Sequence, residues 1–281
     1  MKKRRIIMAG VCIAVILLTA CSLHQSNMQV INTAGNQKSS LEVQANDQQY
    51  TVKEQRMPGD VTNTGKEVRS EQKEISPVPT EYRIGEFPII AQMPELPTGC
   101  EVTALTMVLN YYGYTIDKVT MATEYLPTVP ANLHYGSDGL LYGSDLNEYF
   151  VGDPTTELGY ICGTGAIAAA ADRYLAEMGS GLRTEDITGA EPEQLYELIS
   201  EDIPVLVWVT IGMEDRRMPQ GWYTEQGEYV DWSTNDHGAV LIGYSEDIVV
   251  IADPISGLIE YNRDQFEKVF ESRGNQSVIL C

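Results

Sequence analysis

Cys100 is the residue of this chain best placed for nucleophilic chemistry. It lies in the segment Leu96–Gly113, where Thr98 and Glu101 form the Thr-x-x-Glu pattern of a helix capping box. This pattern predicts Thr98 as the N-cap and places Cys100 at the second helical position. The partial positive charge of a helix N-terminus lowers the pKa of a thiol and favours the thiolate. The segment thus indicates a nucleophile on a rigid helix, although a buried, inert thiol fits the local pattern as well.

A cysteine nucleophile needs a base, and three histidines are available. His24 lies in a polar N-terminal stretch and is not expected to contribute. His134 lies in the polar loop 132–139, which favours a solvated or substrate-facing imidazole. His237 opens the apolar run Gly238–Tyr244 and leads directly into buried residues, so it is the favoured base.

The expected geometry of a β-hairpin supplies a partner for His237. If Ser245–Asp247 forms a three-residue turn, Ala239 lies opposite Asp253, which makes Asp253 the diagonal neighbour of His237 on the same face. Imidazole and carboxylate can bridge that separation. A turn of two or four residues would shift the register. Asp236 is expected to point to the opposite face.

Two further side chains could take part. Gln92 lies eight residues before Cys100, and its amide could join the Cys100 N–H in binding an oxyanion, although a loop glutamine that bonds backbone fits equally. Cys162 precedes a second predicted helix, which Thr164 could cap, and is a rival nucleophile. A packing or disulfide role for Cys162 is the alternative.

The periodicity of apolar residues predicts a mixed fold. Early helices followed by late strands indicate an α+β protein with an antiparallel sheet. The segment 212–236 carries several aromatic residues and reads as a surface excursion that could form one wall of a cleft. The predicted helices are 99–112, 165–178, 191–200 and 264–272, and the predicted strands are 203–211, 239–244, 248–252 and 277–280.

The N-terminus resembles an export signal. Four basic residues precede a short apolar run, and Leu-Thr-Ala-Cys then resembles a lipobox, which implies that Cys21 is diacylated after removal of residues 1–20. An ordinary secretory signal is the alternative, and both place the mature chain outside the cytoplasm. Residues 21–82 are polar, with few aromatic residues, and are expected to form a flexible stalk. Residues 83–281 have the size of one domain.

The net charge limits which partners the chain can bind, and the cysteine count limits its disulfides. Removal of the signal takes away four basic residues, so 19 basic residues become 15 against 40 acidic ones, a net charge of about −25. This balance argues against nucleic-acid binding and against attraction to anionic lipid. Of five cysteines, Cys12 leaves with the signal and Cys21 carries lipid. The remaining three exclude complete pairing, and a Cys162–Cys281 bridge stays open.

Several separated blocks of the sequence belong together: Gln92, PTGCEVTALTMVLNYYG, PVLVWVT, DHGAVLIGY, IADPISG and QFEKVFESRGNQSVIL. In this order they resemble the C39-like peptidases, a branch of the papain-like cysteine peptidases. The resemblance covers roughly residues 85–281 and implies a papain-like fold. It also implies that Cys100 is the nucleophile, His237 the base, Asp253 the orienting acid and Gln92 the oxyanion donor. No metal or cofactor is implied.

The resemblance also bounds the activity. C39 domains that trim leader peptides are fused to a transporter, whereas an exported and anchored member is expected to hydrolyse a peptide or protein outside the membrane. A wall-peptide crosslink is one such substrate. Acyl or aminoacyl transfer on the same scaffold, and partner binding without catalysis through segment 212–236, remain alternatives. The block Phe150–Pro154 also resembles the family and is expected to shape the cleft rim. The oligomeric state stays open.

Overall fold

A sheet of seven strands lies at the centre of the computed structural model, which describes residues 78–218 and 220–281. Its strands run in the order β12-β11-β10-β7-β13-β6, and β1 pairs with β10. Every pairing in this sheet is antiparallel, which confirms the predicted α+β class. The strands are β1 (Tyr82–Arg83), β6 (Thr184–Asp186), β7 (Val205–Thr210), β10 (Asp236–Tyr244), β11 (Ile248–Asp253), β12 (Gly257–Asn262) and β13 (Ser277–Leu280).

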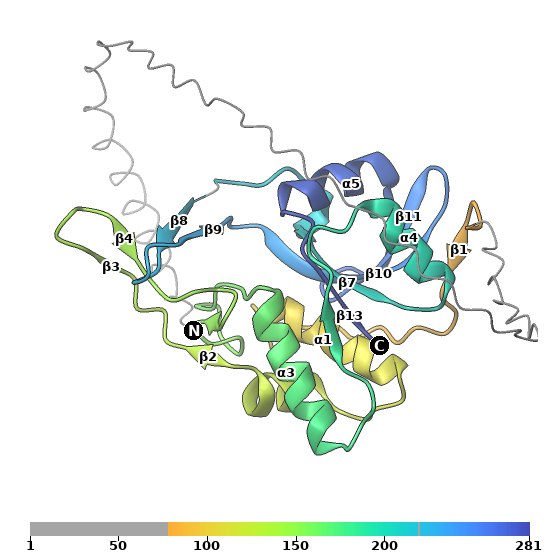
Figure 1. The fold of residues 1–281 in the computed structure, drawn as a ribbon, viewed down its shortest axis with the longest axis horizontal. Helices are drawn as coiled ribbons and strands as arrows, with labels where there is room; N and C mark the ends of the chain where they lie inside the picture. The colour runs from red at the N-terminus through yellow and green to blue at the C-terminus, as the bar shows by residue number, and fades with distance from the viewer. Residues whose placement is uncertain (1–77, 219) are drawn as a thin grey trace, which may run out of the picture. The chain divides into compact units, whose positions relative to one another are not determined.

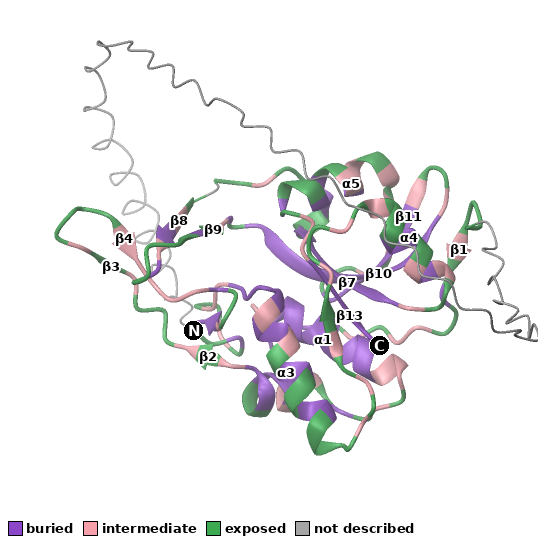
Figure 2. Ribbon diagram, in the orientation of Figure 1, coloured by how far each residue is buried: buried purple, intermediate pink, exposed green. Residues whose placement is uncertain are grey.

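Strands β7 and β10 form the most buried part of the sheet. Apart from Asp236 and His237 at the start of β10 and Thr210 at the end of β7, both are apolar runs, the pattern of strands covered on both faces, and every residue of each strand is buried. Figure 2 shows this buried band along β7, β10 and β13. His237, at the start of β10, pairs with Val209 of β7, so the candidate base lies on a strand held from both sides.

Helices cover this sheet (Figure 1). Helix α1 (Cys100–Tyr111) packs on β10 and contacts α3 (Thr164–Glu177), whereas α4 (Pro192–Ser200) contacts β10 and β1, and α5 (Arg263–Ser272) contacts β7 and β12. Each lies within one residue of its predicted bounds. The shorter helical segments are α2 (Lys118–Thr120), a π-helix at Met121–Tyr125 and a 3₁₀ turn at Ile211–Met213.

The aromatic segment 212–236, predicted as a surface excursion, contains a β-hairpin between β7 and β10. Its two strands pair with each other, and one of them also pairs with β4. Trp222 is buried in a small apolar cluster, and its indole N–H donates to the carbonyl of Ser144, 2.7 Å away. The four strands of this sheet are β3 (His134–Tyr135), β4 (Leu141–Tyr142), β8 (Gln220–Tyr223) and β9 (Tyr229–Trp232); separately, β2 (Thr128–Val129) pairs with β5 (Phe150–Val151).

The β10–β11 hairpin has the predicted strand register near His237 and Asp253, although its turn differs from the prediction. At its outer end Tyr244 pairs with Val249 instead of the expected Ile248, because the turn is one residue longer than predicted. A bulge between Leu241 and Gly243 then removes the offset. Beyond it Val240 pairs with Ala252, which brings Ala239 opposite Asp253 as predicted.

The described residues begin near the expected start of the domain. The hydroxyl of Tyr244 donates to the carbonyl of Pro79, and β1 is hydrogen-bonded to β10, so the predicted boundary at residue 82 falls within β1. The signal segment 1–20 and Cys21 lie outside the described residues. Among the residues described, no helix combines the length and apolar character needed to cross a bilayer.

Candidate active site

His237 and Asp253 form a buried pair at the inner end of the β10–β11 hairpin. Their side chains are 1% and 4% exposed, and His237 Nε2 lies 3.1 Å from Asp253 Oδ1. The same oxygen accepts hydrogen bonds from the backbone N–H groups of Ile255 (2.7 Å) and Ser256 (3.0 Å). Burial alone would raise the pKa of Asp253, but the hydrogen bond and charge of His237 and these N–H donors lower it below its ordinary value.

This pairing determines which nitrogen of His237 can act. An ionised carboxylate accepts only, so the Nε2 atom carries the proton and the Nδ1 atom is left with its lone pair. Nδ1 is buried and has no hydrogen-bond partner within the described part of the chain. The imidazole is therefore oriented as a base with a free acceptor.

Cys100 is the first residue of α1, one position earlier in the helix than predicted. The predicted capping box is wrong: the N-cap is Gly99, and no side chain caps this end. The hydroxyl of Thr98 instead donates to the carbonyl of Thr156, 3.0 Å away, and the carboxyl of Glu101 turns into the core. Cys100 still lies in the first turn, where backbone N–H groups lack helical acceptors.

Glu101 is a functional candidate that sequence reasoning treated only as a cap. It is 1% exposed, and its Oε1 accepts from the N–H of Cys162 at 3.3 Å while its Oε2 accepts from Cys100 Sγ at 3.3 Å. Burial raises the pKa of Glu101 to about 7. Leu105 and Val108, one and two turns further along α1, are apolar, and this spacing could have indicated that Glu101 faces the core.

The surroundings of Cys100 oppose the predicted low pKa. Burial raises the pKa of the Cys100 thiol well above its ordinary value, and the charge of Glu101 raises it further. The N–H of Gly238, which donates to Cys100 Sγ at 3.5 Å, acts in the other direction. Desolvation is thus the largest influence on the pKa of this thiol.

Gln92 is fixed beside the nucleophile segment. Its backbone N–H donates to the carbonyl of Pro254 (2.8 Å), directly after Asp253, and its side-chain Nε2 donates to the carbonyl of Pro97 (2.8 Å). Lys118 Nζ donates to the carbonyl of Gln92 at 2.8 Å. The residue is 3% exposed. Gln92 is thus tied both to the segment before Cys100 and to the end of β11.

The block Phe150–Pro154 reaches the same segment. The N–H of Thr98 donates to the carbonyl of Pro154 at 3.4 Å, and the hydroxyl of Thr98 contacts the carbonyl of Asp153 at 3.5 Å. The turn that follows β5 therefore packs against the residues just before Cys100.

The rival residues have other environments. Cys162 is fully buried, its carbonyl accepts from the indole N–H of Trp208 (2.7 Å), and burial raises the pKa of its thiol well above the ordinary value. Cys281 is exposed, and both cysteines are free, so the bridge left open by the sequence is not formed. Cys162 contacts the site through its backbone N–H, which donates to the Glu101 carboxyl. Its buried thiol therefore has a packing role.

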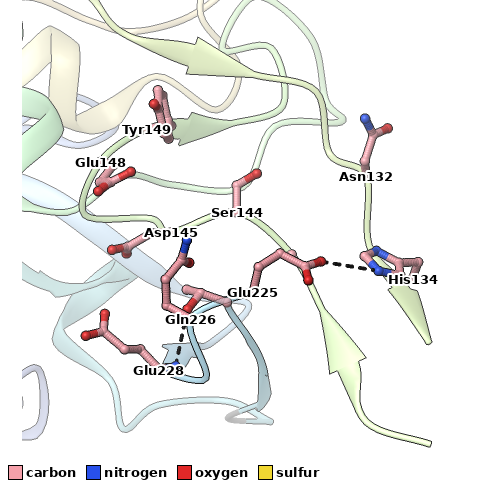
Figure 3. Close-up of a pocket in the computed structure, with 11 residues that line it drawn as sticks. Asn132, His134, Ser144, Asp145, Glu148, Tyr149, Glu225, Gln226 and Glu228 are labelled. Carbon is pink, nitrogen blue, oxygen red and sulfur yellow. Dashed lines mark hydrogen bonds and ion pairs between the residues drawn. The ribbon is translucent and has the colours of Figure 1, made fainter. Parts of the chain in front are cut away.

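His134 lies in a different hollow (Figure 3). It faces Glu225, with 3.5 Å between His134 Nε2 and Glu225 Oε1, in an acidic pocket of about 450 Å³. None of Gln92, Cys100, His237 and Asp253 lines this pocket. Throughout the described ranges, no group of three or more acidic, histidine or cysteine side chains is arranged to hold a metal ion.

Comparison with known proteins identifies the family. The model of the Peptidase_C39 like family matches residues 84–278. The chain belongs to this family. The YvpB protein of Bacillus subtilis strain 168, itself uncharacterized, is 31% identical over 188 residues, which cover 66% of this chain and 70% of YvpB.

A solved structure supports the fold. A candidate C39-like peptidase from Bacillus anthracis, known from its crystal structure, superposes with a TM-score of 0.62 at 31% identity, over 72% of this chain and 97% of the other. The α+β, C39-like peptidase fold expected from the sequence is therefore confirmed.

Proposed function

We propose that this chain is a cysteine peptidase in which Cys100 is the nucleophile, His237 the base, Asp253 the orienting acid and Gln92 an oxyanion donor. The observation that carries the proposal is the buried His237–Asp253 pair, which leaves Nδ1 of His237 free as an acceptor. Cys100 lies beside it, because the residue next to His237, Gly238, donates its N–H to Cys100 Sγ. Family membership supports a peptidase in general terms.

The proposed reaction begins with transfer of the thiol proton from Cys100 to Nδ1 of His237. The resulting thiolate attacks the substrate carbonyl, and Asp253 stabilises the imidazolium through Nε2. The oxyanion is held by the Cys100 N–H and the side-chain amide of Gln92. His237 then protonates the leaving amine, and water hydrolyses the thioester.

A comparison of the Cys100→Ala variant with the parent chain tests the proposal. The full chain in detergent is incubated with a diverse peptide library, and new termini are detected by mass spectrometry. The variant is expected to lose at least about 10³-fold of the turnover while it keeps its thermal unfolding curve. Cys162→Ala serves as the matched control and is expected to cleave. Equal cleavage by Cys100→Ala and the parent would overturn the assignment.

The same assay separates hydrolysis from transfer. Addition of a simple amine or an aminoacyl acceptor diverts the thioester if acceptors other than water are preferred. Hydrolysis predicts free carboxyl termini at every acceptor concentration tested. Products that carry the acceptor in preference to water would instead favour a transferase.

We further propose that Cys21 anchors the enzyme by lipid on the outer face of the membrane. The support is the Leu-Thr-Ala-Cys sequence after a basic and apolar leader. Growth with an alkyne-bearing fatty acid is expected to label the parent chain and not a Cys21→Ser variant. Label that persists in Cys21→Ser would contradict this attachment site.

A further inference from the structure

The Cys100 thiol is directed at Glu101 and not at the proposed base. Its hydrogen-bond contacts are Glu101 Oε2, to which Sγ donates at 3.3 Å, and the N–H of Gly238 at 3.5 Å. At the same time Nδ1 of His237, the atom that should receive the thiol proton, lacks any partner within the described ranges. The described contacts therefore show the thiol hydrogen-bonded to a carboxyl and the base unengaged.

Glu101 is built into this position. The carboxyl is 1% exposed, and its second oxygen accepts from the N–H of Cys162 at 3.3 Å. A Cβ placed on Gly238 would lie 2.7 Å from Glu101 Cγ, so strand β10 comes this close only because residue 238 is glycine. Glu101 is therefore packed directly against the backbone of β10 at Gly238.

We propose that Glu101 is a positioning residue that holds the Cys100 thiol in a resting orientation and, once ionised, disfavours its thiolate. This inference rests on the proposed function. An ionised carboxylate accepts the S–H hydrogen bond and repels a negative sulfur, whereas a neutral carboxyl can donate to the thiolate. Release of the thiol lets its proton pass to Nδ1 of His237, which gives the thiolate and imidazolium.

The other charged groups around Glu101 do not change this picture between pH 5.5 and 8.5. The Cys162 thiol stays neutral because burial raises its pKa well above the ordinary value. Arg273 interacts with Glu101 at longer range and is held by Asp236, with 3.0 Å between Nη1 and Oδ2. His237 also acts on Glu101, since a positive charge on its ring lowers the pKa of the Glu101 carboxyl.

Alkylation of Cys100 by iodoacetamide tests the proposal without any substrate. The rate is followed on the Cys100 peptide by mass spectrometry in the full chain, which separates it from reaction at the exposed Cys281. At pH 8.5 the Glu101→Gln variant is expected to react about tenfold faster than the parent, and at pH 5.5 within about twofold of it. Glu124→Gln, which neutralises an exposed carboxyl, is expected to match the parent at both values.

A ratio of rates that is the same at pH 5.5 and 8.5 would overturn the proposal, since a merely structural change acts equally at both. If Glu101→Gln fails to fold, the pH profile of the parent chain is used: its alkylation rate is expected to rise less steeply with pH above about 7 than below it, because ionised Glu101 then opposes the thiolate. A slope that stays the same through pH 7 overturns the proposal. Since Cys100→Ala cleavage is measured separately, failure here and failure of the peptidase assignment can be told apart.

Discussion

Two buried carboxyl groups, Asp253 on β11 and Glu101 on α1, flank the His237–Cys100 pair, and they differ in how their charge is balanced. Asp253 accepts from His237 and from two backbone N–H groups, so the pKa of this residue is lowered although burial opposes this. Glu101 accepts from one backbone N–H and from a thiol, so burial dominates and raises the pKa of Glu101 to about 7.

The difference shows that burial does not by itself decide the charge of a side chain. The hydrogen bonds that a carboxylate accepts from N–H groups, here from the His237 ring and two backbone amides, can outweigh the effect of burial. At neutral pH Asp253 is ionised, whereas Glu101 is close to half-ionised and can respond to pH. The three predictions below test this contrast.

The largest effect on activity is expected from loss of the Asp253 carboxylate. Asp253→Ala removes the group that orients His237 and stabilises its cation, and kcat/KM is expected to fall about 10²- to 10⁴-fold. Peptide cleavage at saturating and at low substrate concentration measures it. Asp247→Ala, in the exposed turn of the same hairpin, is the control. A loss of threefold or less in Asp253→Ala would remove Asp253 from the proposed mechanism.

The second prediction concerns stability and pH. The folded protein keeps the proton on Glu101 up to about pH 7, but an ordinary carboxyl releases it near 4.5, so the folded state binds more protons between these values. Its free energy of unfolding therefore falls as the pH rises through this window. Relative to the parent, Glu101→Gln is expected to gain about 3 kcal/mol in unfolding free energy between pH 4.5 and 8.

The contribution of Asp253 to stability changes with pH in the opposite direction. Because the folded state lowers the pKa of Asp253, its contribution is present above the ordinary value and is lost as the pH falls below it. Urea unfolding at a series of pH values, with the Asp253→Ala variant beside Glu101→Gln, measures both slopes. Parallel pH profiles for Glu101→Gln and the parent would contradict the raised pKa.

The smallest effect is expected at Gly238. In Gly238→Ala the new methyl group would meet Glu101 Cγ at 2.7 Å and Cα at 2.9 Å, so α1 or β10 must shift. The expected loss is about 1–3 kcal/mol of unfolding free energy. Thermal and urea unfolding measure it, and Gly85→Ala, where a Cβ meets nothing within 4 Å, serves as the control. Unchanged stability in Gly238→Ala would show that the close approach is not required.

The sequence predicted the helix bounds to within one residue because apolar residues recur at helical spacing in each, even where the expected cap of α1 is not formed. It also predicted His237 and Asp253 as neighbours, since strand pairing fixes which residues share a face. The turn length was wrong, yet the bulge at residue 242 restored the inner register. Nothing in the local sequence indicates such a compensation.

The charge state around Cys100 could not be read from the sequence. Thr-x-x-Glu predicted a capping box, but Thr98 donates to Thr156 and Glu101 accepts from Cys162, both far away in the chain. Tertiary partners outcompeted the local pattern. The thiol pKa followed from the same contacts, because desolvation depends on the residues that surround Cys100 in space.

The bulge in β10 separates the two ends of the hairpin. It absorbs the extra residue of the Ser245–Ile248 turn before the strands reach Val240 and Ala252. A turn that gains or loses a residue can be accommodated by the presence or absence of this bulge, with no change in the spacing between His237 and Asp253. The outer tip of the hairpin can therefore differ in length and composition, while its inner end retains the same spacing of His237 and Asp253.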